Sequence, residues 1–190
     1  PGVRLRLGVK DSAEVIADLL AGRVDLGFVG ARSPHPDLHF EDFAADEIVL
    51  VASPGLAAGL PVGPLAAEVA ARLPRVDREE GSGTRAVVED HFANLDAPLR
   101  AASVVLEAGS LVELKAAVLS GAGVAFTSRA AAREELEQGH LVALPIETVR
   151  IPRHVFAAWR RDRELAPPAR RFLEVARAAL APARRAGGAE

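Results

Sequence analysis

Apolar and polar residues alternate at the start of the chain, and this period of two over residues 3–9 is typical of a β-strand. A helical pattern follows, which Asp11 or Ser12 caps at its start and Gly22 closes. The apolar run at residues 24–29 predicts a second strand. Because a helix joins the two strands, we expect them to pair in parallel.

The second half of the chain repeats this order. Residues 103–107 predict a strand, and Ser110 with Glu113 forms a capping box at the start of the next helix. Residues 123–127 predict the strand that follows. The capping serine and the phenylalanine of the second strand are equally far apart in both halves. The repeat therefore indicates two related lobes.

The repeat also indicates how the chain is divided between the lobes. A strand at residues 75–77 and a helix precede the second copy, whereas nothing precedes the first copy, so we expect the first lobe to be incomplete at its N-terminus. A late strand at 154–159 and an amphipathic helix at 167–180 are expected to return to the first lobe. Two crossovers would then leave a cleft for a ligand. The expected limits are residues 1–73 with 146–190 for the first lobe and 74–145 for the second.

Composition narrows the classes of partner. The 190 residues are 49% hydrophobic and carry a formal net charge of -3, which argues against direct contact with a nucleic-acid backbone. There is no cysteine, so a thiol nucleophile and a cysteine metal site are excluded. The uncharged stretch at 48–67 is interrupted by Pro54, Pro61 and Pro64, and it predicts a strand and a loop rather than a membrane span.

The run Glu-Glu-Gly-Ser-Gly-Thr-Arg at residues 79–85 leads into a helix at 86–95. Its glycines would let a ligand approach backbone N–H groups at a helix start, where the helix dipole favours anions. Ser82 and Thr84 add hydroxyl donors. The run indicates a site for a small anion, although a helix cap by Ser82 without any ligand explains the same residues. The run alone leaves both interpretations open.

Other candidate chemistry is sparse. His35 and His39 are four residues apart, but prolines flank His35, so the helical geometry of a metal site is not expected. Arg85 could reach an anion or pair with Glu89 one turn later. No nucleophile elbow and no phosphate-loop lysine is present. We therefore expect no catalytic residues, no metal and no cofactor.

Six pieces of the chain, in order and spacing, resemble the effector-binding domain of LysR-type transcriptional regulators. They are residues 1–8, 22–28, 47–51, 81–85, 107–110 and 121–126. The resemblance covers nearly the whole chain. It implies an α/β, two-lobed periplasmic-binding-protein-like (type 2) fold. Each lobe would be a mainly parallel sheet flanked by helices, with two crossovers.

The resemblance also implies a function. A small anionic effector would bind in the interlobe cleft of a bacterial, cytoplasmic homo-oligomer. That protein would contact DNA only through an N-terminal helix-turn-helix domain that this chain lacks, and would not contact a membrane. By position, the implied effector-binding residues are Ser12, Ser82, Gly83, Thr84, Thr127 and Ser128. Helix capping stays open as the alternative role of Ser12, Thr127 and Ser128.

Two other functions are compatible with the same two-lobed fold. One is a solute-binding protein that feeds a transporter. The other is an enzyme, such as a prephenate dehydratase-like or porphobilinogen-polymerising enzyme, although no constellation of acid, base and nucleophile supports it. The residues upstream of Pro1 would separate the three functions, since they would encode a helix-turn-helix, a signal peptide or further catalytic domain.

Overall fold

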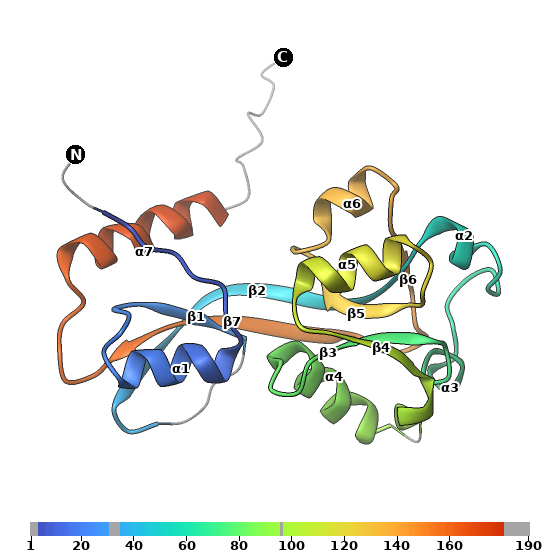
Figure 1. The fold of residues 1–190 in the computed structure, drawn as a ribbon, viewed down its shortest axis with the longest axis horizontal. Helices are drawn as coiled ribbons and strands as arrows, with labels where there is room; N and C mark the ends of the chain where they lie inside the picture. Colours follow the sequence, from blue (N-terminus) through green and yellow to red (C-terminus); the bar gives the residue numbers. More distant parts are fainter. Residues whose placement is uncertain (1–3, 31–34, 96, 181–190) are drawn as a thin grey trace, which may run out of the picture.

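Two long antiparallel strands join two lobes in the computed structural model, which describes residues 4–30, 35–95 and 97–180 (Figure 1). These strands are β2 (Leu38–Ala52) and β7 (Ile151–Arg160). They pair from Leu38 opposite Arg160 to Ile48 opposite Ile151, with an irregularity between Asp42 and Ala44. The two expected crossovers are confirmed.

The first lobe holds both ends of the described chain. It contains α1 (Ser12–Leu20), β1 (Gly27–Val29), α7 (Pro167–Leu180) and the adjoining parts of β2 and β7. β1 pairs with β7 in antiparallel register. The hydrophobic core of the first lobe is small, with Leu19, Leu38 and Ala158 fully buried.

The second lobe holds the remaining elements. They are α2 (Pro54–Ala57), α3 (Ala67–Ala70), β3 (Arg75–Arg78), α4 (Gly83–Ala93), a 3-10 turn (Ala101–Ser103), β4 (Val104–Ala108), α5 (Leu111–Leu119), β5 (Ala125–Ser128), α6 (Arg133–Glu137) and β6 (Val142–Leu144). β3 and β4 pair in parallel, whereas β5 and β6 both pair with β2 in antiparallel register. At the start of α5, the expected serine cap is confirmed, since Glu113 N donates to Ser110 Oγ over 3.2 Å; this bond is one half of a capping box.

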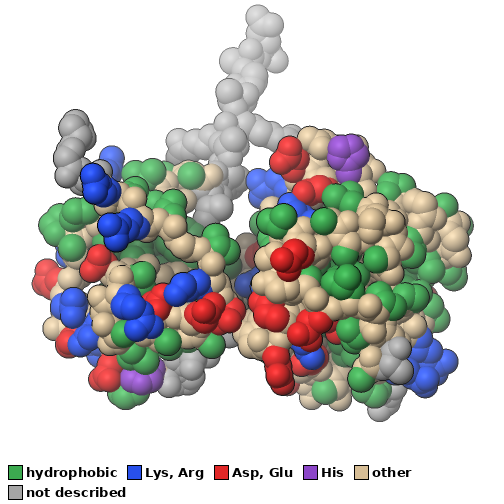
Figure 2. All heavy atoms as spheres, viewed as in Figure 1, with side chains coloured by type: hydrophobic (Ala, Val, Ile, Leu, Met, Phe, Trp, Pro, Cys, Tyr) green, Lys and Arg blue, Asp and Glu red, His purple; other side chains and the backbone are tan. Residues whose placement is uncertain are grey.

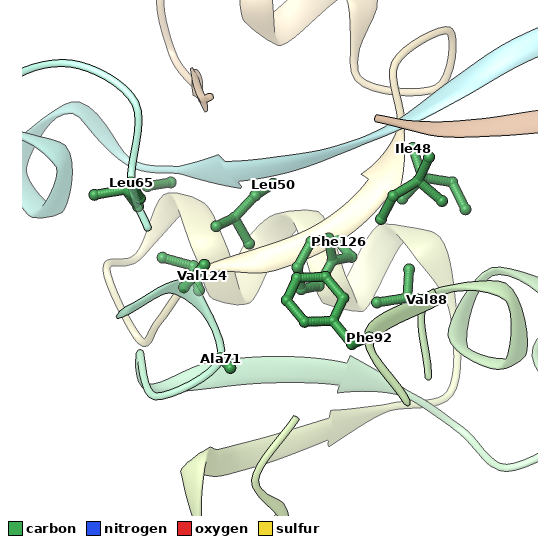
Figure 3. Close-up of a cluster of buried hydrophobic side chains, with 11 residues drawn as sticks. Ile48, Leu50, Leu65, Ala71, Val88, Phe92, Val124 and Phe126 are labelled. Carbon is green, nitrogen blue, oxygen red and sulfur yellow. The ribbon is translucent and has the colours of Figure 1, made fainter. Parts of the chain in front are cut away.

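The end of β2 is apolar because both of its faces are covered. Ile48 and Leu50 belong to a cluster with Phe92 and Phe126, while Val49 and Val51 belong to the cluster that contains Leu114 and Val118 of α5. Figure 3 shows the first of these clusters, where the Phe92 ring of α4 meets the Phe126 ring of β5 at 5.3 Å between centroids. This packing fixes α4, and with it the start of α4, against the sheet.

The expected strand at residues 3–9 is wrong for the part that the structure describes; Val3 lies outside the described residues. Residues 4–10 form no strand, and the side chains of Leu7 and Val9 are 79% and 102% exposed. The expected parallel pairing with the strand at 24–29 is also wrong, because β1 pairs with β7. Alternation predicts an amphipathic strand, but a strand also needs a hydrogen-bonded neighbour, and the described residues supply none.

The expected fold is confirmed as two-lobed and α/β, but the expectation of mainly parallel sheets is wrong for the larger sheet. Its strands β1, β7, β2 and β5 follow one another with antiparallel pairings, and β6 also pairs antiparallel with β2. At the centre of this sheet, β2 leaves the first lobe and β7 returns to it, so the two strands run in opposite directions.

The lobe limits that the sequence suggested stay a prediction. Packing favours assigning residues 48–71 to the second lobe, because Leu65, Ala70 and Ala71 share one buried cluster with Phe92 and Phe126.

Candidate functional site

A hollow of about 460 Å³ lies where the two lobes meet. The starts of α1, α4 and α5, the ends of β3 and β5, and the crossing strand β7 surround it. Its lining includes Lys10, Asp11, Thr84, Ser110, Thr127 and Arg153. Figure 2 shows the groove between the lobes, with acidic side chains on both of its rims.

The helices that begin at this hollow differ in how their starts are capped. Asp11 Oδ1 accepts from Glu14 N at the start of α1, and Ser110 Oγ accepts from Glu113 N at the start of α5. At the start of α4, Ser82 occupies the cap position without a capping hydrogen bond, and the first turn holds no acidic residue. Helix starts attract anions through their N–H groups. The start of α4 is therefore the one that a ligand could occupy.

Ser12 and Gly83 lie against each other across the boundary between the lobes. Ser12 Oγ accepts from Gly30 N at 3.3 Å. A Cβ at Gly83 would lie 3.2 Å from Ser12 Oγ, so only a residue without a side chain fits there without a shift. The structure thus brings these two expected site residues together, and it gives the cap of α1 to Asp11 rather than to Ser12.

Thr84 contacts a residue that sequence reasoning missed. Arg153 Nη1 donates to Thr84 Oγ1 over 3.0 Å, and Arg153 Nε is buried without a hydrogen-bond partner. Burial lowers the pKa of Arg153; the nearby Asp46 carboxylate opposes this shift and the charge of Arg78 adds to it. A Cβ at Gly30 would lie 2.2 Å from Arg153 Nη2, so the absence of a side chain at Gly30 makes room for the guanidinium.

The other cations at the hollow are neutralised by carboxylates. Lys10 Nζ lies 2.8 Å from Asp18, and Arg78 donates to both carboxylate oxygens of Glu79 at 2.7 and 2.6 Å. The hydrogen bond from Arg78 lowers the pKa of Glu79.

The sequence left open whether Arg85 reaches an anion or pairs with Glu89, and the structure shows the pairing. Arg85 Nε donates to Glu89 at 2.8 Å and its Nη1 to Glu107 at 2.9 Å, so it pairs with carboxylates in this structure rather than facing a ligand unpaired.

The remaining expected residues differ in their surroundings. Thr127, 2% exposed, lines the hollow from β5. Ser128 Oγ donates to Asp46 Oδ2 at 2.5 Å and accepts from Ala131 N at 3.1 Å, within a turn. It does not cap a helix, because α6 begins only at Arg133 and has Ala132 in its cap position. Ser82 is buried, and neither Ser82 nor Gly83 is among the lining residues. The ligand contacts of all six expected residues stay a prediction.

Sequence reasoning missed Arg153 and Gly30, although each carried a weak signal. Arg153 is a charged residue within a strand whose neighbours Ile151 and Ala157 are buried. Gly30 directly follows the apolar strand β1. Neither signal shows that the two positions meet at Thr84.

Other features of the described residues do not suggest a competing site. A larger hollow of about 1090 Å³ follows β2 and residues 143–151, but it contains none of the expected site residues. Within the described ranges, no group of three or more His, Asp or Glu side chains could hold a metal ion. Across the same ranges, no helix combines the length and apolar character needed to cross a membrane.

Comparison with known proteins gives a family match over most of the chain. The model of the LysR substrate binding domain matches residues 1–181. The chain is 59% identical over 182 residues to the phosphonates import ATP-binding protein PhnC of Anaeromyxobacter dehalogenans (strain 2CP-C), covering 96% of this chain and 36% of that protein. It is 31% identical over 178 residues to the HTH-type transcriptional regulator YeiE of Escherichia coli (strain K12), covering 92% of this chain and 58% of that protein.

A solved structure has the same fold. The regulatory domain of CcmR from Synechocystis PCC6803, in complex with 2-PG, superposes with a TM-score of 0.81 at 24% identity. The match covers 94% of this chain and 84% of that chain.

Proposed function

Since the chain belongs to the family of LysR substrate-binding domains, we propose that it is the effector-binding domain of a transcriptional regulator and that it binds a small anion between its lobes. The observation that carries this proposal is the uncapped start of α4, which presents Thr84 to the interlobe hollow. Thr84 Oγ1 accepts from Arg153, so its own proton stays available to donate to an anion.

The names of two similar proteins support an oxyanion as the ligand. The PhnC relative is named for the import of phosphonates, and the CcmR domain was solved with 2-PG. Phosphonates are small oxyanions of a size that a hollow of about 460 Å³ admits. For the chain in hand we propose a ligand of this kind.

We propose, from the family, that the rest of the function belongs to a longer protein. The chain spans 58% of the length of YeiE. We propose that the complete regulator is a cytoplasmic homo-oligomer that contacts DNA through a helix-turn-helix domain outside this chain. We propose no catalytic role for the domain.

Calorimetric titration with sulfate, phosphate, methylphosphonate and acetate tests the ligand proposal. Thr84→Val keeps the shape of the side chain and removes its hydroxyl, so we expect the affinity for the best ligand to fall about tenfold or more. Ser103→Ala is the matched control, because its hydroxyl bonds Arg72 O outside the hollow. The proposal is wrong if no anion binds, or if Thr84→Val binds as tightly as wild type.

A second candidate is a ligand-sensing domain of a phosphonate importer. The 59% identity to part of PhnC favours it. Both candidates share the cleft, but they differ in the rest of the protein. ATP hydrolysis by the complete protein that responds to the ligand would favour transport, whereas ligand-dependent retention of promoter DNA would favour regulation.

A further inference from the structure

We infer that Arg153 supplies the positive charge that holds the ligand, and that it makes the cleft selective for a –PO₃ head group over a carboxylate. This inference rests on the proposed function of the cleft. It names a residue that the helix-start motif does not contain, and it names the chemical class of the ligand.

The first argument is the state of the Arg153 charge in the structure. Arg153 lines the hollow, its Nε is buried without a partner, and its Nη1 bonds only the neutral hydroxyl of Thr84. Among the described residues, no carboxylate forms an ion pair with it. Arg153 is partly buried, and a charge partly removed from water is costly unless an opposite charge compensates it; Asp46, opposite on β2, does so only from nearby and without an ion pair. A bound anion would provide that compensation.

The second argument is that the surrounding chain makes room for this side chain. A Cβ at Gly30 would lie 2.2 Å from Nη2 and 2.8 Å from Nε, closer than van der Waals contact allows, so the Nε–Nη2 edge of the guanidinium packs against the Gly30 backbone. Residue 30 therefore leaves the Nε–Nη2 edge of the guanidinium without a side-chain neighbour. This edge is the one through which arginine binds oxyanions with two parallel hydrogen bonds. A rotation of the side chain toward the hollow would present the edge to a ligand.

The third argument is the match of charge. Lys10 and Arg78 are paired with carboxylates, whereas Arg153 adds a full positive charge beside the uncapped start of α4. A helix start adds about half a positive charge to that of Arg153, while Asp11 and Glu14 add carboxylates to the same lining. A phosphate ester carries about −1.5 to −2 near neutral pH, whereas a carboxylate carries about −1. A –PO₃ group also offers a third oxygen to Thr84 and Thr127.

The test compares ligands that differ only in the head group. Methylphosphonate and methyl phosphate probe a –PO₃ group on carbon and on oxygen, and acetate probes the carboxylate. In calorimetric titrations, wild type is expected to bind at least one –PO₃ ligand at least tenfold more tightly than acetate. Arg153→Gln should lower that affinity about tenfold to one-hundredfold. Arg153→Lys keeps the positive charge but cannot form two parallel hydrogen bonds to the ligand. Its affinity should lie between those of wild type and Arg153→Gln.

Arg150→Gln is the matched control, because it removes the same charge from an exposed residue outside this hollow. It should bind like wild type. Thermal melts without ligand check that Arg153→Gln folds.

If wild type binds a –PO₃ ligand and Arg153→Gln binds it equally well, the inference is wrong and the proposed function stands. If wild type binds acetate as tightly as both –PO₃ ligands, the selectivity is wrong. If it binds no anion, the proposed function itself fails.

Discussion

Thr84 Oγ1 accepts a hydrogen bond of 3.0 Å from Arg153 Nη1, although 69 positions separate the two residues in sequence. Thr84 lies at the start of α4 in the second lobe, and Arg153 lies on the crossing strand β7. The bond therefore links the anion-attracting helix start to the strand that joins the lobes. A ligand that engages either residue acts on both.

Gly30→Ala should weaken ligand binding without touching the ligand. The new Cβ would lie 2.2 Å from Arg153 Nη2, so the guanidinium must move away from its place beside Thr84. We expect the affinity for methylphosphonate to fall about tenfold, the value of one lost hydrogen bond to a charged group. Gly55→Ala is the control, since its Cβ would meet no atom within 4 Å. Equal affinities of the two variants in calorimetry would contradict the role of Gly30.

Arg153→Met should stabilise the ligand-free protein or leave it unchanged. The substitution removes a charge whose Nε is buried and unpaired, and it keeps an apolar stem of similar length. We expect the free energy of unfolding to rise by about 0–2 kcal/mol, with the stabilisation by methylphosphonate lost. Urea unfolding with and without ligand measures both effects. A clear loss of ligand-free stability would indicate that Arg153 is structural.

Phe92→Ala should destabilise the second lobe strongly. The side chain is fully buried, and its ring meets that of Phe126 edge-on. Removing a buried phenylalanine costs about 3–5 kcal/mol because a cavity remains. Val112→Ala on α5 is the control, since Val112 is 75% exposed and should change stability by less than about 0.5 kcal/mol. Urea unfolding followed by circular dichroism gives both values.

The Arg78–Glu79 pair should stabilise the fold only above acidic pH. Arg78 holds the pKa of Glu79 below its ordinary value of 4.5. A lowered carboxylate pKa contributes stability above the unfolded-state pKa, and the contribution is lost as pH falls through the folded-state pKa. Arg78→Gln should therefore be less stable than wild type at pH 7, and the difference should shrink below pH 4.5. A difference that stays constant across that range would rule out this linkage.

We propose that residues 4–10 become a strand when a further strand is available to pair with them. Their apolar side chains Leu5, Leu7 and Val9 alternate and are exposed here. Pairing with a further strand would bury that face. A chain extended upstream should melt at a higher temperature and aggregate less. Unchanged melting and solubility would show that the exposed face needs no cover.

The sequence predicted local features more reliably than distant contacts. Ser110 and Glu113 are three residues apart, so the serine cap of α5 could be recognised from spacing alone, and its hydrogen bond from Glu113 N is confirmed. The strand prediction for residues 3–9 was wrong because alternation of apolar and polar residues does not show whether a neighbouring strand exists. Arg153 was missed for a related reason, since nothing near residue 153 shows that folding brings it to Thr84. Ser82, Gly83 and Thr84 were singled out because glycine and hydroxyl residues at a helix start have local meaning.

The pairing of β2 with β7 has a mechanical consequence for signalling. These strands run side by side between the lobes and are hydrogen-bonded to each other from Leu38 to Ile48 on one strand and from Arg160 to Ile151 on the other. A two-stranded ribbon bends and twists readily, but its ladder of hydrogen bonds prevents the strands from sliding past one another. The hydrogen-bonded pairing therefore favours changes of angle and twist between the lobes over translation of one lobe along the other. If a ligand binds between the lobes as proposed, those two quantities are the ones that it would change.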